Sequence, residues 1–186
     1  MTKAQTVDWK ALAADQLEFH WNVHFRPRIA DLTDDEYFWE PVDGCWSVRH
    51  ADDGTYMADY EVPNPDPAPV TTIAWRLAHI TVGVFAGRNA SHFGGPAIDY
   101  SNYTYPATAA EALRNLDEHH DRWVAGVAAM DEADLAQPVG PAEGVYADRP
   151  YAELVLHINR ETMHHGAEIL LLRDLWRNVS QSRHIG

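Results

Sequence analysis

The chain of 186 residues is poor in thiols, in lysine and in long apolar runs. It has one cysteine, Cys45, and two lysines against twelve arginines. A single thiol excludes an internal disulfide framework. No stretch approaches the roughly 18 consecutive apolar residues that a membrane-spanning helix requires. Met1 to Lys10 also lacks a basic region followed by an apolar run, so we expect no signal peptide and a cytoplasmic protein.

Positive charge is scarce as well. The chain has 14 Lys+Arg against 28 Asp+Glu, a formal net charge of -14. Proteins that follow a phosphate backbone or an anionic lipid surface need clustered cations. The composition therefore argues against nucleic acids and anionic membranes as partners. The length fits one domain over residues 1–186, since single domains commonly reach about 200 residues.

The first of four helical patterns is expected from Val7 to Ile29. One apolar face of this segment is made of Leu12, Phe19 and Val23. Pro27 lies near its end, where a proline stops a helix. This segment would form the first helix of a bundle.

The second helix is expected to begin at Thr71 or Thr72 and to end before Gly94-Gly95-Pro96. It is apolar almost all round and should be buried. The third begins at Thr108, where Thr108-Ala-Ala-Glu111 fits a capping box. Its core face is made of Leu113, Leu116, His120, Trp123, Val124 and Val127. The fourth helix begins after Pro150.

A long crossover, Leu32 to Val70, separates the first two helices. Its sequence is rich in proline, glycine and aspartate, and Tyr56 to Val62 predicts a short strand of a β-hairpin around the Asp53-Gly54 turn. The fold class is therefore all-α: a four-helix bundle with a long crossover between helices 1 and 2. Such bundles build metal sites from side chains on facing helices. We expect the segment from Asp43 to Val70 to shape the pocket entrance.

The fourth helix places two polar residues, Glu161 and His165, on its apolar face. That face is otherwise formed by Leu154, Ile158, Ile169, Leu172 and Trp176. A buried carboxylate costs several kcal/mol unless a cation or metal compensates it. His79, inside the second helix, can supply a third ligand. Two imidazoles and one carboxylate form a ligand set of catalytic zinc, with the fourth position open.

A structural interpretation of the same residues stays open at this point. A Glu and a His spaced by four on a helix often form a local hydrogen bond, or the Glu contacts a nearby arginine. A single histidine in an apolar helix, such as His79, is commonly hydrogen-bonded to backbone.

Four segments resemble the DinB-like superfamily of metal-binding four-helix bundles. They are Leu32–Pro41 (LTDDEYFWEP), Trp46–Arg49 (WSVR), Thr72–Ile80 (TIAWRLAHI) and Glu161–Glu168 (ETMHHGAE). In that family one His of the second helix and two residues four apart on the last helix hold the metal. The resemblance thus implies His79, Glu161 and His165 as metal ligands.

The identity of the middle ligand narrows the resemblance. Many family members have His there, whereas Glu161 is similar to an actinobacterial branch that includes mycothiol-dependent maleylpyruvate isomerase, in which zinc activates the thiol of mycothiol. That isomerase also has a C-terminal domain that contributes to its active site and that this sequence does not include. The resemblance therefore implies the metal site and not the isomerase substrate.

Four further residues are candidates for the site. His157, one turn before Glu161, and His120, on the third helix, are candidate catalytic proton donors. Arg76 and Trp75, beside His79, are candidates for binding a thiol cofactor or substrate. The alternatives are hydrogen-bonded core histidines, a structural salt bridge of Arg76 and core packing of Trp75.

The leading hypothesis is a zinc-dependent thiol transferase or isomerase. It would activate a low-molecular-weight thiol, mycothiol by the resemblance, toward a small-molecule electrophile. Ni²⁺, Fe²⁺ and Mn²⁺ also suit these ligands. The alternatives are a metal-dependent hydrolase and a non-catalytic metal- or ligand-binding stress protein. The sequence leaves open whether the chain is a monomer or a homodimer.

Overall fold

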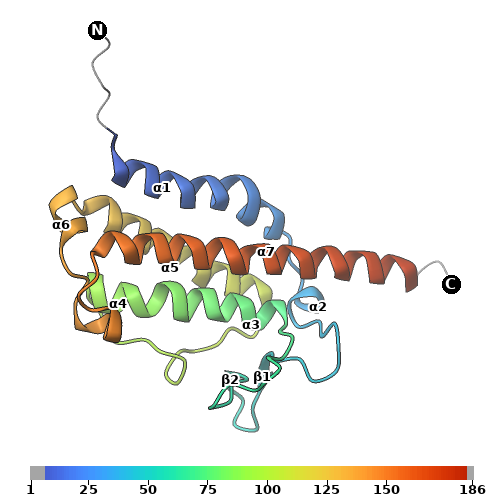
Figure 1. Ribbon diagram of the computed structural model, residues 1–186. Helices are drawn as coiled ribbons and strands as arrows, with labels where there is room; N and C mark the ends of the chain where they lie inside the picture. The colour runs from blue at the N-terminus through green and yellow to red at the C-terminus, as the bar shows by residue number, and fades with distance from the viewer. Residues whose placement is uncertain (1–6, 184–186) are drawn as a thin grey trace.

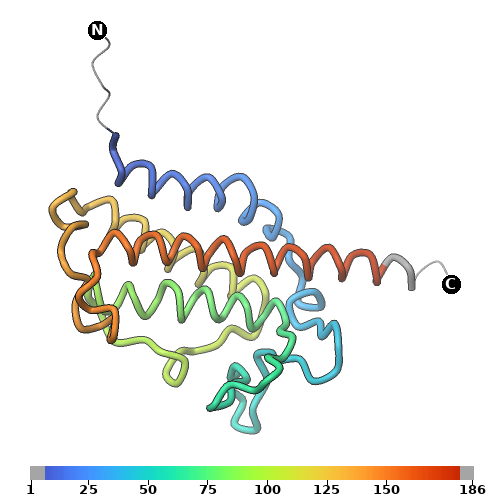
Figure 2. Tube along the Cα trace, in the orientation of Figure 1, coloured from blue at the N-terminus to red at the C-terminus, as the bar shows by residue number. Residues whose placement is uncertain are grey.

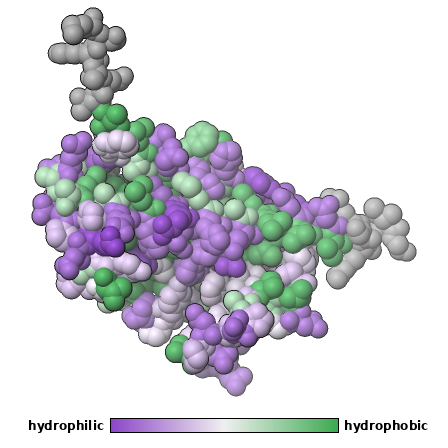
Figure 3. All heavy atoms as spheres, in the orientation of Figure 1, coloured by the Kyte–Doolittle hydropathy of each residue, from purple (hydrophilic) through white to green (hydrophobic). Residues whose placement is uncertain are grey.

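The computed structural model describes residues 7–183, with side chains through residue 180. Its four long helical segments form a bundle, which confirms the predicted all-α fold (Figure 1). The first and last segments run in one direction, and the second and third run in the opposite direction (Figure 2). Among the helices of the described residues, none has the length and apolarity to cross a membrane. The face of the molecule seen in Figure 3 is mostly hydrophilic, with scattered hydrophobic side chains.

The first segment consists of α1 (Trp9–Phe19), the π-helix η1 (His20–Phe25) and the 3₁₀ helix η2 (Arg26–Ile29). Its extent agrees with the prediction, but the predicted apolar face is wrong. Leu12, Phe19 and Val23 are 50%, 55% and 54% exposed. The buried residues are Leu17, Trp21, Phe25 and Ile29. These residues recur every four positions, and the wider turn of the π-helix keeps that spacing on one side of the segment. Two of them carry large aromatic rings, whose burial stabilises the fold most.

The second segment contains α3 (Ile73–Ala78), the π-helix η3 (His79–Ala86) and α4 (Gly87–Phe93). The Thr72 hydroxyl caps its N-terminus by accepting from the Trp75 backbone N–H, and Gly94, with φ of 84°, ends it. Both boundaries match the prediction. Most residues of η3 are buried, as its apolar sequence predicts.

The third segment is α5 (Ala109–Ala129) and the fourth is α7 (Tyr151–Arg183). The predicted core face of α5 is buried except for half-buried Val124. Thr108 accepts from the Glu111 backbone N–H as expected. The second half of the predicted capping box differs, because the Glu111 carboxylate accepts from the Ala107 N–H and not from that of Thr108. The short helices α6 (Glu132–Ala136) and η4 (Pro141–Tyr146) connect α5 to α7.

The crossover contains the short helix α2 (Asp34–Tyr37) and the predicted hairpin. Strands β1 (Val48–His50) and β2 (Tyr56–Ala58) pair antiparallel around a turn at Gly54, whose φ is 86°. The second strand ends at Ala58, earlier than the predicted Val62. Figure 1 shows the hairpin below the end of the bundle where α3 begins.

An ion-pair cluster fastens the crossover to α7. The Arg173 side chain, 2% exposed, donates from Nε to Glu36 Oε1 at 3.1 Å. One of its terminal nitrogens lies 2.8 Å from Asp31 Oδ1, and another donates to the Arg28 carbonyl. The Glu36 carboxylate also accepts from the Thr33 backbone N–H. The start of the crossover is therefore held against the last helix by a buried, multiply bonded guanidinium.

Candidate metal centre

The three predicted metal ligands lie together where η3 faces α7. One ligand atom each from His79, Glu161 and His165 lies within 4.8 Å of the others. The rings of His79 and His165 meet edge to face with their centroids 4.5 Å apart. His165 is buried, and His79 and Glu161 are half-buried. The structure thus brings together two imidazoles and a carboxylate at the edge of the core.

The carboxylate and the imidazole of α7 converge without bonding each other. Glu161 Oε2 lies 3.5 Å from His165 Nε2, beyond the 2.7–3.2 Å typical of an N–H···O bond. The alternative of a local Glu–His hydrogen bond is therefore not what the geometry shows. The other alternative, a contact with a nearby arginine, is present on the second carboxylate oxygen, because Arg160 Nε lies 3.5 Å from Glu161 Oε1. Two converging but unbonded ligand atoms, with a second imidazole opposite, fit a divalent cation.

The outer nitrogen of His165 has a carboxylate partner of its own. Nδ1 lies 2.7 Å from Glu168 Oε2, and Glu168 in turn pairs with Arg76 at 2.9 Å. Nδ1 also lies 3.2 Å from an Arg76 nitrogen, but its shorter contact is with the carboxylate, which only accepts. We therefore assign the proton to Nδ1, so that Nε2 keeps its lone pair toward Glu161. Burial lowers the pKa of His165, which favours the neutral ring that a metal ligand needs. Carboxylate–histidine pairs of this kind orient metal ligands.

His79 is held in the same way by a tyrosine. Its Nδ1 lies 2.6 Å from the Tyr100 hydroxyl, which leaves Nε2 for a metal. Burial, followed by smaller effects of His165 and Arg76, lowers the pKa of His79 to about 4. Both histidines are therefore neutral at pH 7.

Gly83 makes the contact between His79 and Tyr100 possible. It lies one turn after His79 within η3, and a Cβ at this position would overlap the Tyr100 hydroxyl. π-helical turns of this type often occur at functional sites. A side chain at residue 83 would therefore displace the tyrosine from the His79 ring.

Arg76 and Trp75 both lie beside the cluster. Arg76 pairs with Glu168 and not with Glu161, and it lies 3.2 Å from His165 Nδ1. The Trp75 indole N–H donates to the Asp59 carbonyl at 2.8 Å. Both residues line a groove of about 690 Å³ between the crossover and α3, together with His79. The crossover thus forms one side of this groove, as expected for the entrance.

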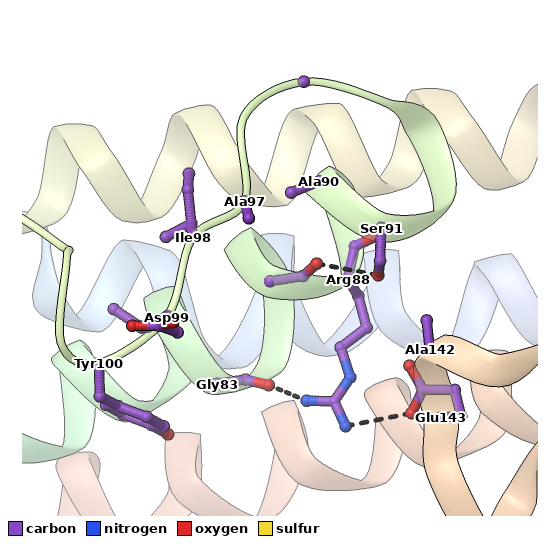
Figure 4. A pocket seen from close by; sticks show the side chains of 13 residues that line it. Gly83, Arg88, Ala90, Ser91, Ala97, Ile98, Asp99, Tyr100, Ala142 and Glu143 are labelled. Carbon is purple, nitrogen blue, oxygen red and sulfur yellow. Dashed lines mark hydrogen bonds and ion pairs between the residues drawn. The ribbon is translucent and has the colours of Figure 1, made fainter.

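The two candidate proton donors have different positions. His157 lies near the ligands, with Nδ1 3.6 Å from Glu161 Oε1, and it accepts from Arg160 at 2.7 Å. It lines a second cavity of about 220 Å³ with Arg88 and Glu143. Figure 4 shows the Arg88 guanidinium between the Gly83 carbonyl and the Glu143 carboxylate.

His120 lies elsewhere in the bundle. It is buried and stacks on Trp21 at 3.7 Å, with Nε2 3.1 Å from Glu18 Oε1. Within the described residues, its contacts are with α1, η1, α5 and η3 side chains and not with the three ligands. This placement fits packing between α1 and α5 and gives no support to a role as proton donor at the cluster.

A second acidic and histidine cluster overlaps the first. Ligand atoms of His164, His165 and Glu168 also lie within 4.8 Å of one another. Here, however, Glu168 is bonded to Arg76, and His164 is largely exposed on the outer side of α7. The arginine beside Glu168 is closer, at 2.9 Å, than Arg160 is to Glu161, at 3.5 Å, and His164 is exposed, so this second group is the poorer metal site.

Sequence reasoning did not identify Tyr100, Gly83 or Glu168 as parts of the site. Glu168 could have been found, because it follows His165 by three residues on the same helix face. Tyr100 had no comparable signal, since it comes from the irregular loop between α4 and α5.

Comparison with known families gives one match. The family model described as the DinB superfamily matches residues 16–169, which include α3, η3, α5 and the three ligand positions. No curated protein and no solved structure matches the chain.

Proposed function

The chain belongs to the DinB superfamily, and on that premise we propose that it is a divalent-metal-dependent transferase or isomerase that activates a low-molecular-weight thiol. His79, Glu161 and His165 are the proposed metal ligands, and zinc is the proposed metal. One observation carries the proposal. Three ligand atoms of the catalytic-zinc type converge within 4.8 Å, and the second nitrogen of each histidine is already engaged by Tyr100 or Glu168.

A divalent cation held by His79, Glu161 and His165 would supply a Lewis acid, which lowers the pKa of a bound thiol. Glu161 contributes one negative charge that an all-histidine site lacks. A sulfur atom beside the site is thereby left more electron-rich and more nucleophilic. Glu168 and Tyr100 engage Nδ1 of the two imidazoles and orient the rings, and burial favours the neutral form of both.

The surroundings of the cluster are compatible with a small-molecule reaction. The groove beside His79, about 690 Å³, has the size of small-molecule sites. His157, 3.6 Å from Glu161, is the proposed proton donor to the product. Mycothiol is the thiol that the resemblance of the ligand triad implies, and the proposed second substrate is a small electrophile.

Thiol consumption by the zinc-loaded chain tests this proposal. We expect mycothiol to be consumed with at least one member of a panel of epoxides, activated alkenes and alkyl halides, and Glu161→Gln to lose that activity. His157→Gln should retain its metal and lose mainly rate. Loaded protein that consumes no thiol with any electrophile would contradict the proposal, and turnover of esters or amides without thiol would support the hydrolase instead.

A further inference from the structure

The groove between the crossover and α3 has an aromatic lining. Its rings come from the crossover, from α3 and η3, and from the loop after α4. We call this cavity of about 690 Å³ the aromatic groove; its ring-bearing residues are Trp46, Tyr60, Trp75, His79, Tyr100 and Tyr105. One of them, His79, is also a proposed metal ligand, so the groove and the metal centre share a wall.

Three of these rings lie in nearly parallel planes. The planes of Trp75 and His79 differ by 7° with centroids 5.5 Å apart, and those of His79 and Tyr100 differ by 13° with centroids 6.3 Å apart. Trp46 lies next to Trp75, with its centroid 5.9 Å away and its ring plane tilted by 40°. An aromatic surface made of these rings therefore lines the groove, with the proposed metal ligand His79 between Trp75 and Tyr100.

Hydrogen bonds fix the rings of this surface in place. The Trp75 indole N–H donates to the Asp59 carbonyl at 2.8 Å, and the Tyr105 hydroxyl donates to the Tyr100 carbonyl at 2.9 Å. The Tyr100 hydroxyl is itself bonded to His79. A surface held in this way loses little conformational entropy when a ligand stacks on it.

Large apolar side chains are exposed on the crossover beside the groove. Tyr60 is 68% exposed and Val62 is 84% exposed, and both line the cavity. Exposed apolar side chains around a concave, aromatic-lined cavity are typical of a ligand-binding site. The opening is thus suited to a ligand that buries an apolar face.

The charges of the lining disfavour anions. Three carboxylates, those of Asp59, Glu61 and Asp99, face one guanidinium, that of Arg76. The Arg76 guanidinium already bonds Glu168, and of the three groove carboxylates Arg49 pairs with that of Asp59, while it also pairs with Glu40. A ligand with its own carboxylate beside the ring would therefore meet net negative charge in the groove.

We propose that the aromatic groove is the substrate subsite of the metal centre and that it takes a planar aromatic group without negative charge. The inference rests on the proposed function for one point, that the reacting atom of the substrate lies beside the metal. The stacking itself depends only on the groove. A saturated ring of the same size would lose the face-to-face contact, and an anionic ring would be repelled.

Three matched probes test the proposal with the full chain, zinc-free and zinc-loaded. They are 2-naphthol, which is planar and neutral, decahydro-2-naphthol, which is neutral but not planar, and 2-naphthoate, which is planar and anionic. In calorimetric titrations of the zinc-free protein we expect 2-naphthol to bind roughly threefold to tenfold more tightly than decahydro-2-naphthol, and 2-naphthoate to bind most weakly. In that zinc-free protein, equal binding of the two neutral probes, tightest binding of 2-naphthoate, or no binding of any probe would overturn the proposal.

Two exposed tyrosines provide a matched pair of variants. Tyr60→Leu, in the groove, should weaken the binding of 2-naphthol and leave the binding of decahydro-2-naphthol unchanged. Tyr146→Leu, at a residue 61% exposed that lines the separate cavity beside His157, should change neither. Because both side chains are exposed, neither substitution should unfold the protein. Equal effects of the two variants would contradict binding in the groove.

Cobalt substitution separates this inference from the proposed function. In the Co²⁺-loaded protein the ring protons of 2-naphthol should be broadened in the NMR spectrum, because the groove shares His79 with the metal centre. Selective naphthol binding without metal or thiol turnover would refute the proposed function and leave the groove as an aromatic site. Thiol turnover with no preference for planar neutral probes would refute the groove and leave the function.

Discussion

Two clusters on the same helix use carboxylates in opposite ways. At the metal centre, Glu161 and His165 converge but leave their ligand atoms unbonded to each other. Two turns further along α7, Arg173 is buried against Glu36 and Asp31 with its donors engaged. In the first cluster the nearest cation to the Glu161 carboxylate is the largely exposed Arg160, whose Nε lies 3.5 Å from Oε1, whereas the second cluster contains a buried guanidinium at its centre. The difference is the basis for proposing a metal at the first cluster, while the second cluster is neutralised by the fold's own arginine.

The largest expected effect on stability comes from breaking the ion-pair cluster of Arg173, Glu36 and Asp31. Arg173→Met leaves the Glu36 carboxylate buried without its partner, which should lower the free energy of unfolding by about 3–5 kcal/mol. Urea unfolding measures the loss. Arg177→Met removes a half-exposed guanidinium that also approaches Glu36, and it should cost less than about 1 kcal/mol. Similar losses for the two variants would show that the cluster is not the anchor of the crossover.

Substitutions around His79, Glu161 and His165 should change the affinity for zinc more than the stability of the fold. Glu168→Gln removes the charge behind His165 Nδ1, and the affinity for zinc should fall about 10–100-fold. Competition with a chromophoric chelator measures it. His164→Gln, an exposed neighbour on the same helix, is the control and should leave the affinity unchanged. Equal affinity in wild type and Glu168→Gln would place the metal elsewhere.

A smaller effect is expected from the tyrosine behind His79. Tyr100→Phe removes the bond to Nδ1, and Gly83→Ala displaces the same hydroxyl, so each should weaken zinc binding by about tenfold. Tyr103→Phe removes a hydroxyl that bonds Asn115, away from the ligands, and should leave zinc binding unchanged. If Gly83→Ala weakened binding and Tyr100→Phe did not, the tyrosine would have no orienting role.

The stability of the metal-free protein should depend on pH differently at the two clusters. The pKa of His79 is about 4 in the folded state, below its ordinary value of 6.5, mainly because of burial. The unfolded chain therefore binds this proton first, and stability is lost as pH falls from about 6.5 toward 4. The Asp31 pKa is lowered chiefly by its hydrogen bond to Arg173, so the ion-pair cluster weakens only below about 4.

Substitution of His79 tests the loss of stability between pH 6.5 and 4 separately from the loss below pH 4. His79→Gln should flatten the slope of stability between pH 6.5 and 4 and leave the loss below pH 4 in place. Chemical unfolding across this pH range, in the presence of a chelator, provides the measurement. An unchanged slope would mean that His79 is not the group whose proton the folded state excludes.

Helix boundaries and contacts within one helix could be predicted from the sequence, because periodicity and spacing control them. Boundaries at Thr72, Gly94 and Pro150 follow from caps and breakers, and the approach of Glu161 to His165 follows from one helical turn. The exposed face of α1 was misassigned because two apolar stripes compete there, and only packing selects the stripe with Trp21 and Phe25. Helical periodicity alone does not contain that choice.

The remaining parts of the site depend on contacts between distant segments. The approach of Tyr100 to His79 requires the loop after α4 to fold back over Gly83. The pairing of Arg76 with Glu168 requires the packing of α3 against α7. Neither contact has a local sequence pattern, since each joins irregular or separate elements.

Metal content tests the central claim most directly. Protein purified without chelator and supplied with zinc should contain about one zinc per chain by elemental mass spectrometry, as expected for a three-ligand site. His164→Ala should retain that metal, and His165→Ala should lose it. Wild type without metal, or His165→Ala with undiminished metal, would contradict the account and leave Glu161 and His165 as a polar pair at the edge of the core.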